Sequence, residues 1–506
     1  MKKLSFMKNT IVLVISNLLT GSLSFIFSII LSKELGAQGV GLFQMIMPIY
    51  VLFICLTCGG VITALSKIIA ELNSKKNTRE LYKSISVSIV FFSFWTIFVS
   101  LFIILFASFL SVYVVKDSRT YISILIFVPA LLFVTISSAL KGYFYGLQNT
   151  TFPAVIDIVE KAIRIIILIA LLNLLKDYEL KYKVSAAVAA MTIGEFVSLI
   201  LLYIFYKKSY LSVKTFVGTP DNVFQIVANV LTISLPLCIN GFLSTALGAF
   251  IAVMIPRRLQ SAGFTAETSL ALYGKISGMS LNIIMFPAII IGAISIVLVP
   301  AISEASTGRN KSTATRKIYY AIKVTTAIAA MSAGLFFSLP HELGKLFYNR
   351  TDLGNIIFSL SFGVLFIYVE FTLFGILNGL GKQGILLRNT MIMSAIDIVS
   401  LYILLGIPEI NIYGYAINFV ISPLVGCILN GYEIRKITNI EINITEMFIF
   451  PIILSLIEIT VLKNIKDIVP KFISNSNLTT VIFILIGAGV YGIVYLIVNP
   501  YFKSRT

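Results

Sequence analysis

The chain has 506 residues, of which 58% are hydrophobic and only 12% charged, and its mean hydropathy is +0.98. These values exclude an ordinary soluble globular protein and are typical of a protein embedded in a lipid bilayer. The net charge of +17 does not indicate nucleic-acid binding, because the basic residues are spread over short loops and form no basic patch with interleaved aromatic residues.

Fourteen runs of mainly apolar residues are long enough to cross the hydrocarbon layer, which requires roughly 20 helical residues. The first run is expected to remain attached as a helix, because no small-residue cleavage site precedes the polar pair Lys33 and Glu34. No segment between runs exceeds about 20 residues, which leaves no room for a soluble catalytic domain. We expect transmembrane helices at 9–31, 44–68, 84–112, 121–145, 153–175, 184–206, 225–255, 269–300, 317–339, 355–379, 385–406, 411–432, 446–463 and 479–499.

The distribution of basic residues predicts the orientation of these helices. With the N-terminus in the cytoplasm, 23 of the 39 Lys and Arg residues fall in cytoplasmic segments, 13 in outer loops and three within spans. Cytoplasmic loops of membrane proteins carry such an excess of positive charge. We therefore expect a multi-pass membrane protein with both termini in the cytoplasm.

All four cysteines, Cys55, Cys58, Cys238 and Cys427, lie in apolar spans. The first two have the spacing of a redox or zinc pair, but no second pair accompanies them, and the only histidine, His341, is far away in the sequence. We expect inert, buried thiols and no metal site.

Charged residues appear inside the fifth span, where Asp157, Glu160, Lys161 and Arg164 follow an i, i+3, i+4, i+7 pattern. This spacing places all four on one stripe of a helix and predicts that Asp157 pairs with Lys161 and Glu160 with Arg164. Ionisable groups at membrane depth cost at least roughly 2.5–3.5 kcal/mol each, so they normally face a cavity or a partner. If the helix begins near Pro153, Arg164 lies roughly 16 Å deep, close to the bilayer midplane.

The stripe has two interpretations. It is either a buried ladder of ion pairs between helices or the lining of a substrate cavity, in which the Arg164 guanidinium binds a phosphate or pyrophosphate bidentately. Lys67, at the inner end of the second span, and Lys275, in the eighth, are further candidates for binding an anionic substrate, although a lysine at a helix end is commonly a snorkelling anchor. The substrate-binding candidates are therefore Arg164, Lys161, Glu160, Asp157, Lys67 and Lys275.

A second group of polar residues predicts a cation site. Asp397 in the eleventh span, Asn418 in the twelfth, Glu370 in the tenth and Asn240, which follows Pro236 in the seventh, provide carboxylate and amide oxygens. Together with carbonyls freed by the proline, these are the hard ligands that a sodium ion needs. The alternative is an ordinary interhelical hydrogen bond. A coupling Na⁺ or H⁺ is the only ion we expect, and no cofactor.

An internal repeat runs through the chain with an offset of 233 residues. Residues 64–72 close the second span and residues 297–305 close the eighth, which aligns Glu71 with Glu304. The same offset aligns the motif Gly-x-x-x-Gly-Leu that follows the fourth span, at 142–147, with its copy after the tenth, at 375–380.

The repeat predicts an all-α membrane protein with two six-helix lobes. We expect the first lobe at 1–212, the second at 213–437 and two accessory helices within 438–506. Six is an even number, so both lobes begin on the same face of the membrane and the repeat is parallel. Lobes of this kind are expected to enclose a central cavity and to move relative to each other.

Three stretches of the sequence resemble the stage V sporulation protein B group of polysaccharide transporters. They are LSKELGAQGVGLFQMIMPIYVLF (31–53), GGVITALSKIIAE (59–71) and LKGYFYGLQNTTFPAVIDIVEKAIRI (140–165). This group belongs to the multidrug/oligosaccharidyl-lipid/polysaccharide superfamily, which also contains MurJ-type lipid II flippases and MATE exporters. The resemblance implies fourteen helices and transport of an undecaprenyl-linked precursor of spore cortex peptidoglycan across the bacterial cytoplasmic membrane.

The resemblance also implies where the cargo binds. The sugar-pyrophosphate head would bind in the cavity near Lys67 and the stripe from Asp157 to Arg164, and the lipid tail would lie outside, beside spans thirteen and fourteen. One departure concerns the first helix, in which such flippases typically carry arginines. Here it has none and offers Asn17, Thr20 and several serines.

We therefore expect a flippase that works by alternating access and not an enzyme. Membrane potential or a cation gradient would supply the energy, because the chain has no nucleotide-binding glycine loop. Its partners would be the lipid-linked oligosaccharide and membrane lipids, with no nucleic acid, and the protein would be a monomer. The first alternative is a cation-coupled MATE-type exporter of small cationic or amphipathic compounds, whose cavity should be dominated by carboxylates. The second, an integral-membrane glycosyltransferase, would need a large extramembrane loop with acid/base residues.

Overall fold

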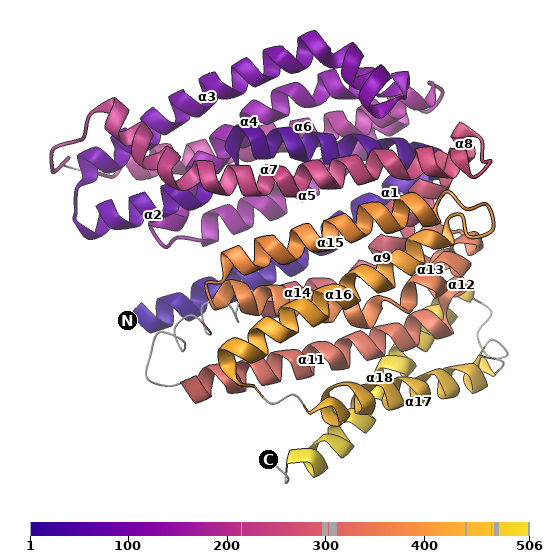
Figure 1. Ribbon diagram of the computed structural model, residues 1–506. Coiled ribbons are helices and arrows are strands. Elements are labelled where there is room, and N and C mark those ends of the chain that lie inside the picture. The colour runs from indigo at the N-terminus through magenta and orange to yellow at the C-terminus, as the bar shows by residue number, and fades with distance from the viewer. Residues whose placement is uncertain are drawn as a thin grey trace. The chain divides into compact units, whose positions relative to one another are not determined.

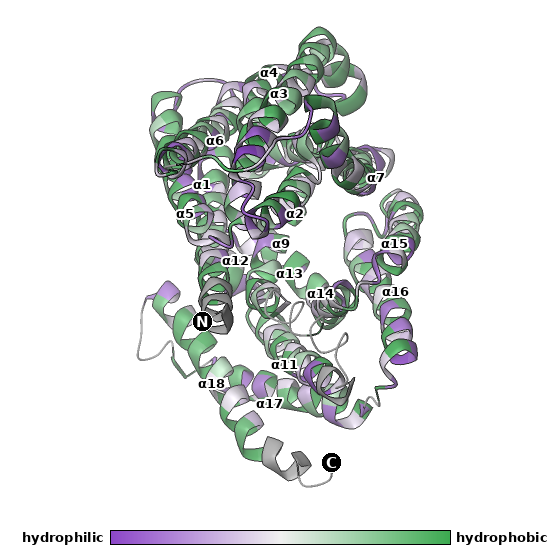
Figure 2. Cartoon of the chain, turned by 90° about the vertical axis from the view of Figure 1, so that its left-hand side faces the viewer, coloured by the Kyte–Doolittle hydropathy of each residue, from purple (hydrophilic) through white to green (hydrophobic). Residues whose placement is uncertain are grey.

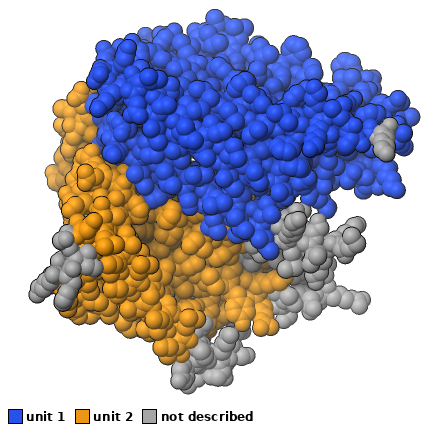
Figure 3. All heavy atoms as spheres, turned by 180° about the vertical axis from the view of Figure 1, so that it is seen from behind, with its two compact units in different colours: residues 1–254 blue, residues 255–506 orange. Residues whose placement is uncertain are grey.

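The computed structural model describes residues 2–213, 215–295, 302, 311–440, 443–466, 468–469 and 475–503, and within these ranges every regular element is helical (Figure 1). The chain divides into two compact units, Met1–Met254 and Ile255–Thr506, which Figure 3 colours separately. The division falls inside one helix of the seventh predicted span. The lobe boundaries at 212 and 437 stay a prediction.

The first unit is built from seven long helices and short elements between them. Hydrophobic residues run along most of the length of the helices (Figure 2). The elements are α1 (Lys2–Cys58), α2 (Val61–Ser74), α3 (Thr78–Phe109), the π-helix η1 (Leu110–Val115), the 3₁₀-helix η2 (Ser118–Thr120), α4 (Tyr121–Gly146), α5 (Thr151–Leu174), α6 (Leu180–Leu211) and α7 (Val223–Ser261), whose last residues belong to the second unit.

The second unit has more broken helices. They are α8 (Ala266–Tyr273), the π-helix η3 (Gly274–Ser280), α9 (Leu281–Met285), α11 (Lys311–Ser338), α12 (Pro340–Tyr348), the 3₁₀-helix η4 (Thr351–Leu353), α13 (Gly354–Ser361), α14 (Val364–Gly379), α15 (Gln383–Leu404), α16 (Tyr413–Thr438), the π-helix η5 (Thr445–Ile449), α17 (Phe450–Ile465) and α18 (Ser476–Lys503). A helical stretch at Ala288–Ser295 also lies in this unit.

Helix α1 is divided by a kink at Gly36, whose backbone angles are φ 65° and ψ −178°. This conformation is essentially restricted to glycine, because a Cβ atom would clash with the neighbouring backbone. The kink separates the first two predicted spans, which therefore form one continuous stretch with a sharp change of direction.

Ten helical stretches in the described ranges are long and apolar enough to cross a membrane, and there are up to twelve when two bent helix pairs are each counted as one span. The first stretch, Ile11–Ser74, contains the second predicted span and all but the first two residues of the first. Helix α5 is absent from this set, although its 24 residues are long enough, because it carries the four charged residues. The structure is thus consistent with the fourteen expected spans. Residues 296–300 of the eighth lie outside the described ranges.

The membrane environment explains the outward faces of these helices. On α3, Phe94 and Leu105 are each 71% exposed. Other large hydrophobic residues are exposed on most of the described helices. Such a surface would be unstable in water, but lipid chains cover it at no cost. The described helices therefore satisfy their backbone internally and present apolar side chains to the bilayer.

The predicted repeat is visible in the helix ends. Helices α4 and α14 end at the equivalent glycines Gly146 and Gly379. The backbone hydrogen bonds that follow are the same in both: the first three residues after α4 donate to the carbonyls of residues 143, 145 and 144, and those after α14 donate to residues 376, 378 and 377. Every pair differs by 233 residues, so the same local structure closes both helices. Glu304, the partner of Glu71 in the other alignment, lies outside the described residues.

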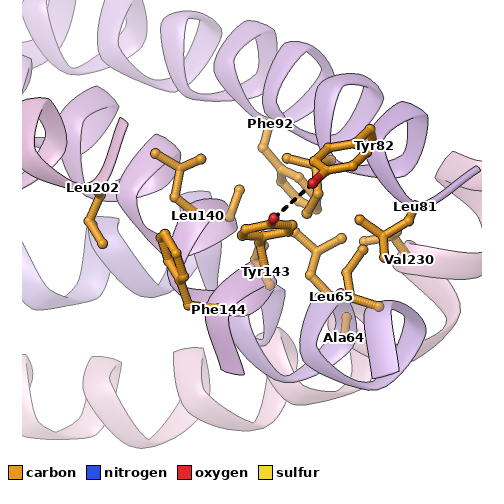
Figure 4. Packing of buried hydrophobic residues seen from close by; sticks show 14 of the residues in the cluster. Ala64, Leu65, Leu81, Tyr82, Phe92, Leu140, Tyr143, Phe144, Leu202 and Val230 are labelled. Atoms are coloured by element: carbon orange, nitrogen blue, oxygen red, sulfur yellow. Dashed lines mark hydrogen bonds between the residues drawn. The ribbon is translucent and has the colours of Figure 1, made fainter. Parts of the chain in front are cut away.

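The first unit has a large apolar core between α2, α3, α4 and α6 (Figure 4). Leu65 and Leu140 are fully buried in it, and the hydroxyl groups of Tyr82 and Tyr143 lie 3.1 Å apart. Gly142 allows the close approach of α2, because a Cβ atom at this position would lie 2.8 Å from the Cβ atom of Leu65. This core holds α4 and α6 rigidly beside α5, which carries the charged stripe.

Candidate functional site

The charged residues of α5 form ion pairs with both neighbouring helices. Arg164 is paired with Glu160, one turn before it, and its Nη2 atom lies 3.1 Å from the Oε1 atom of Glu195 on α6. The Nζ atom of Lys161 lies 3.1 Å from Glu160 Oε2. Because these contacts join α5 to α6, the stripe is also a structural link between helices.

At the end of the stripe nearer the start of α5, the partner comes from α4. The Nζ atom of Lys141 donates a hydrogen bond of 2.7 Å to Asp157 Oδ1. The expected pairing of Asp157 with Lys161 is therefore wrong, while that of Glu160 with Arg164 is confirmed. The physical reason is that Lys161 reaches the carboxylate of its immediate neighbour, which leaves Asp157 free to face the adjacent helix.

The cluster, which we define as Lys141, Asp157, Glu160, Lys161, Arg164 and Glu195, contains three cations and three anions. Glu160 and Arg164 are buried, with 4% and 8% of their surface exposed. Charges removed from water in this way are tolerated only when they are paired. The balance of charges in the cluster thus explains how α5 can carry it through the membrane.

A glycine on α6 makes space for the buried part of the cluster. A Cβ atom on Gly194 would lie 2.9 Å from Glu160 Oε1 and 3.4 Å from Arg164 Nε. Any larger residue at this position would push against the carboxylate. Even so, the Nε atom of Arg164 is buried and has no hydrogen-bond partner among the described residues. The guanidinium therefore keeps one donor that the cluster does not use.

Two of the cations also line a cavity inside the first unit. Its volume is about 260 Å³, and its polar lining consists of Ser24, Gln44, Lys161 and Arg164. The rest of the lining is apolar and is provided by Leu23, Phe27, Phe43, Met47 and Met191. The stripe therefore has the features of both interpretations. Its side chains form ion pairs between helices, and Lys161 and Arg164 also line a cavity.

The kink in α1 shapes this cavity. Leu23, Ser24 and Phe27 come from the part of α1 before Gly36, whereas Phe43, Gln44 and Met47 come from the part after it. In a straight helix these two segments would lie along one line, and they could not both face a cavity of this size. The kink at Gly36 turns them toward it. The first helix, which has no arginine, contributes polar groups in place of charges.

The remaining substrate-binding candidates lie elsewhere. Lys67 is exposed on α2 and does not line this cavity. Lys275 belongs to η3 in the second unit, where its Nζ atom lies 2.8 Å from Asp352 Oδ2. Arg350 pairs with the same carboxylate at 3.0 Å. The role of either lysine in binding substrate stays a prediction.

Two of the cation-site candidates meet in the second unit. The Nδ2 atom of Asn418 on α16 donates a hydrogen bond of 2.9 Å to Asp397 Oδ1 on α15, and the Ser400 hydroxyl donates to the other end of the same amide. Glu370 on α14 is buried, with 7% of its surface exposed, and lies within electrostatic range of Asp397. Asn240 belongs to α7 in the first unit. These contacts match the interhelical hydrogen bond, and the cation site stays a prediction.

The four cysteines are free thiols, of which Cys58 is buried and the others are partly exposed. The Cys238 thiol donates to the backbone oxygen of Cys55 at 3.2 Å, so this pair joins α7 to the end of α1. Among the residues that the structure describes, no group of three His, Cys, Asp or Glu side chains is placed to hold a metal ion.

Sequence reasoning missed three members of the site. Lys141 and Glu195 are not among the substrate-binding candidates that the sequence pattern predicts. Gly194 gave no signal beyond its position beside Glu195. A useful signal would have been the three charges at 141, 157 and 195, each in a neighbouring apolar span, since such charges need partners.

Comparisons with known proteins agree with this architecture. Residues 6–306 match the family described as "Polysaccharide biosynthesis protein". Stage V sporulation protein B of Bacillus subtilis (strain 168) is 25% identical over 448 residues, which are 88% of this chain and 86% of the relative. Lipid II flippase MurJ of the same organism is 26% identical over 538 residues, covering 97% and 94%. A structure of lipid II flippase MurJ in an inward closed conformation superposes with a TM-score of 0.72 at 16% identity, covering 97% of this chain and all of that one.

Proposed function

The chain belongs to the polysaccharide biosynthesis protein family, and from this premise we propose that it is a flippase for a lipid-linked cell-wall oligosaccharide precursor. The cargo resembles lipid II, and transport proceeds by alternating access across the cytoplasmic membrane. The named relatives, a sporulation protein and a lipid II flippase, support this function and a role in peptidoglycan synthesis during sporulation.

The observation that carries the proposal is the pair Lys161 and Arg164 in the wall of the α5 cavity. Both side chains are cationic, and they are held inside a membrane-spanning unit. A guanidinium binds phosphate oxygens in a planar, bidentate geometry, and a lysine adds a point charge beside it. The pair is thus suited to the pyrophosphate that links a sugar to a polyprenol.

The size of the cavity limits what it binds. Sites for whole drug-sized ligands have volumes of roughly 300–1,000 Å³, whereas this cavity has about 260 Å³. It has room for the phosphate groups of the cargo, and the rest of the oligosaccharide and its lipid would extend beyond it. We infer that it recognises the charged link between the two parts, which all polyprenyl-pyrophosphate sugars share.

Binding requires an exchange of partners within the cluster. In the structure, Glu160 and Glu195 neutralise Arg164. An entering pyrophosphate competes with these carboxylates for the guanidinium. While the pyrophosphate holds the guanidinium, Glu160 and Glu195 lose this partner, and carboxylates without a partner are costly inside the membrane. The two carboxylates therefore compete to recover Arg164 and favour release of the cargo, as repeated loading and release require.

The same observation argues against a MATE-type exporter of cationic compounds. Such a protein should place carboxylates in its binding cavity, but the charged residues that line this one are a lysine and an arginine. The paired carboxylates of the cluster lie behind them. The buried Glu370 and the half-buried Asp397, in the second unit, are kept in this proposal for a coupling cation.

A flipping assay in proteoliposomes with fluorescent lipid II tests the function. The variant Arg164→Gln with Glu195→Gln removes the arginine together with one of its carboxylate partners, so that the charge balance is kept. We expect a loss of flipping of at least about tenfold, because a hydrogen bond to a charged group contributes roughly 1.5–3 kcal/mol.

The matched control is Arg388→Gln with Glu433→Gln. This pair, 2.8 Å apart, joins α15 to α16 in the second unit and lies outside the cavity. Flipping should stay within about twofold of the wild type. If the Arg164 double variant is inserted and folded and flips lipid II at the wild-type rate, the cavity does not bind the cargo. Preferred transport of a cationic dye over lipid II would favour the exporter instead.

A further inference from the structure

A buried glutamate on α17, far along the chain from the α5 cavity, has no role in the proposed binding of cargo. Glu458 has no exposed surface, and both of its carboxyl oxygens are buried without a hydrogen-bond partner among the described residues. A carboxyl group that only stabilised helix packing would be paired, as Glu446 is with Lys323 near the start of the same predicted span.

The surroundings of Glu458 are built to hold a carboxyl group closely. Gly334 on α11 and Gly487 on α18 face it from the two helices that pack against α17. A Cβ atom on Gly487 would lie 3.0 Å from Glu458 Oε1, and one on Gly334 would clash with Oε2. The two glycines thus form a niche that fits the glutamate, and a side chain at either position would push its carboxyl group aside.

Among the described residues, no charged group faces this niche. From α18 the facing titratable group is the hydroxyl of Tyr491, which is buried, has no described hydrogen-bond partner and lies within electrostatic range of Glu458. From α11, Gly334 faces the carboxyl group and Leu335 lies beside Gly487, and neither residue titrates. The nearest ion pairs on α17 and its extension, at Glu446 and Lys466, are roughly 18 and 12 Å away along the helix at 1.5 Å per residue.

These surroundings select a proton over a metal cation. A bound metal ion needs several oxygen ligands, whereas the neighbours of Glu458 are glycines, leucines, Ser455 and one tyrosine. A bare carboxylate without a partner is very unfavourable in an apolar interior, and protonation removes the charge. The only ligand that this niche accommodates is therefore a proton.

We propose that Glu458 is a proton-binding site that holds its proton while α11, α17 and α18 are closed around it and exchanges the proton when they separate. The proton is then one coupling ion of transport, beside any cation at Glu370 and Asp397, a consequence that rests on the proposed flippase function. The glycines at both contacts let α11 and α18 approach the carboxyl group closely, which closes the niche around the proton.

Infrared spectroscopy of the full-length protein in liposomes tests the site without reference to transport. Subtracting the spectrum of Glu458→Gln from that of the wild type should leave the C=O band of a carboxylic acid at neutral and mildly alkaline pH. The matched control, Glu446→Gln, should remove carboxylate bands, because Glu446 is paired with Lys323. Carboxylate bands in the Glu458 difference spectrum would overturn the proposal.

Exchange is tested by transfer to deuterium oxide. The acid band should shift as the proton is replaced, and a band that does not shift over days would mean a permanently locked acid, against the proposal. Glu458→Leu provides a second variant, which should fold because an apolar side chain of similar size suits the niche. Its spectrum should lack the same band.

The transport arm compares lipid II flipping with and without a proton gradient. The ratio of the two rates should exceed one for the wild type and fall to one for Glu458→Gln. A wild-type ratio of one, or an unchanged ratio in the variant, would refute the coupling role. If the wild type does not flip lipid II at all, the proposed function fails, while the infrared experiment still decides the proton site.

Discussion

The ion pair between Arg164 and Glu195 makes the most detailed prediction about the cluster. The two side chains are 9% and 20% exposed and their charged atoms lie 3.1 Å apart. At an effective dielectric constant of about 20, their Coulomb attraction is about 5 kcal/mol, an upper limit because both groups lose hydration. Residues in one ion-pair network typically couple by about 0.5–3 kcal/mol, and we expect a value in the upper half of this range.

The single variants should differ in their cost. Arg164→Gln leaves Glu160 and Glu195 in the membrane with one cation fewer, and we expect a loss of about 3–5 kcal/mol in the free energy of unfolding. Glu195→Gln removes a more exposed partner and should cost about 1.5 kcal/mol, the lower end for a hydrogen bond to a charged group. The double variant should cost less than the sum of the two, because it restores the balance of charge.

Trp95, the only tryptophan in the chain, provides the assay. It lies on α3 in the same unit, and its Nε1 atom donates a hydrogen bond of 3.0 Å to the backbone oxygen of Leu56. Its fluorescence during unfolding in detergent micelles therefore reports on the unit that contains the cluster. The four free energies of the double-mutant cycle give the coupling directly.

The pair Lys141 and Asp157 is the internal control for this cycle. Its side chains are 22% and 32% exposed, so hydration screens their attraction and we expect a coupling of at most about 1 kcal/mol. Additive effects of the Arg164 and Glu195 variants, or equal coupling in both pairs, would refute the view that burial makes the α5–α6 contact strong.

Three further variants test the site and its scaffold. Gly36→Ala should lower the free energy of unfolding by about 1–3 kcal/mol, since its backbone conformation is strained for any other residue, and unchanged stability in the same fluorescence assay would contradict the kink. Gly194→Ala should push against Glu160 and slow flipping of fluorescent lipid II. The control Gly248→Ala, whose Cβ atom would meet no neighbour within 4 Å, should not slow it. Equal flipping rates in the two variants would show that the space beside Gly194 is dispensable. Asp397→Asn should abolish any dependence of flipping on a sodium gradient, and an unchanged dependence would remove the predicted sodium site.

Much of the architecture was predictable because it depends on local patterns. Apolar runs of sufficient length predict spanning helices, and the two glycine motifs 233 residues apart predicted equivalent helix ends, which the backbone hydrogen bonds confirm. The stripe on α5 follows from helical periodicity alone. These features need no knowledge of how one helix is rotated against the next.

The partners of the charges were not predictable in the same way. Whether Asp157 meets Lys161 or Lys141 depends on the rotation and depth of α5 against α4, and this is set by side-chain packing over the whole core. The pairing of Arg164 with Glu195 depends likewise on α6, and on the space that Gly194 provides there.

The cavity and the isolated acid are also tertiary features. The lining of the cavity comes from two segments of α1 that meet only because Gly36 bends the helix. In the sequence, Glu458 looks like any other charge within a span, and its lack of a partner becomes visible only when three helices surround it. Periodicity determines which residues share a face of one helix, whereas contacts between helices decide which of their charges are neutralised and which remain available for function.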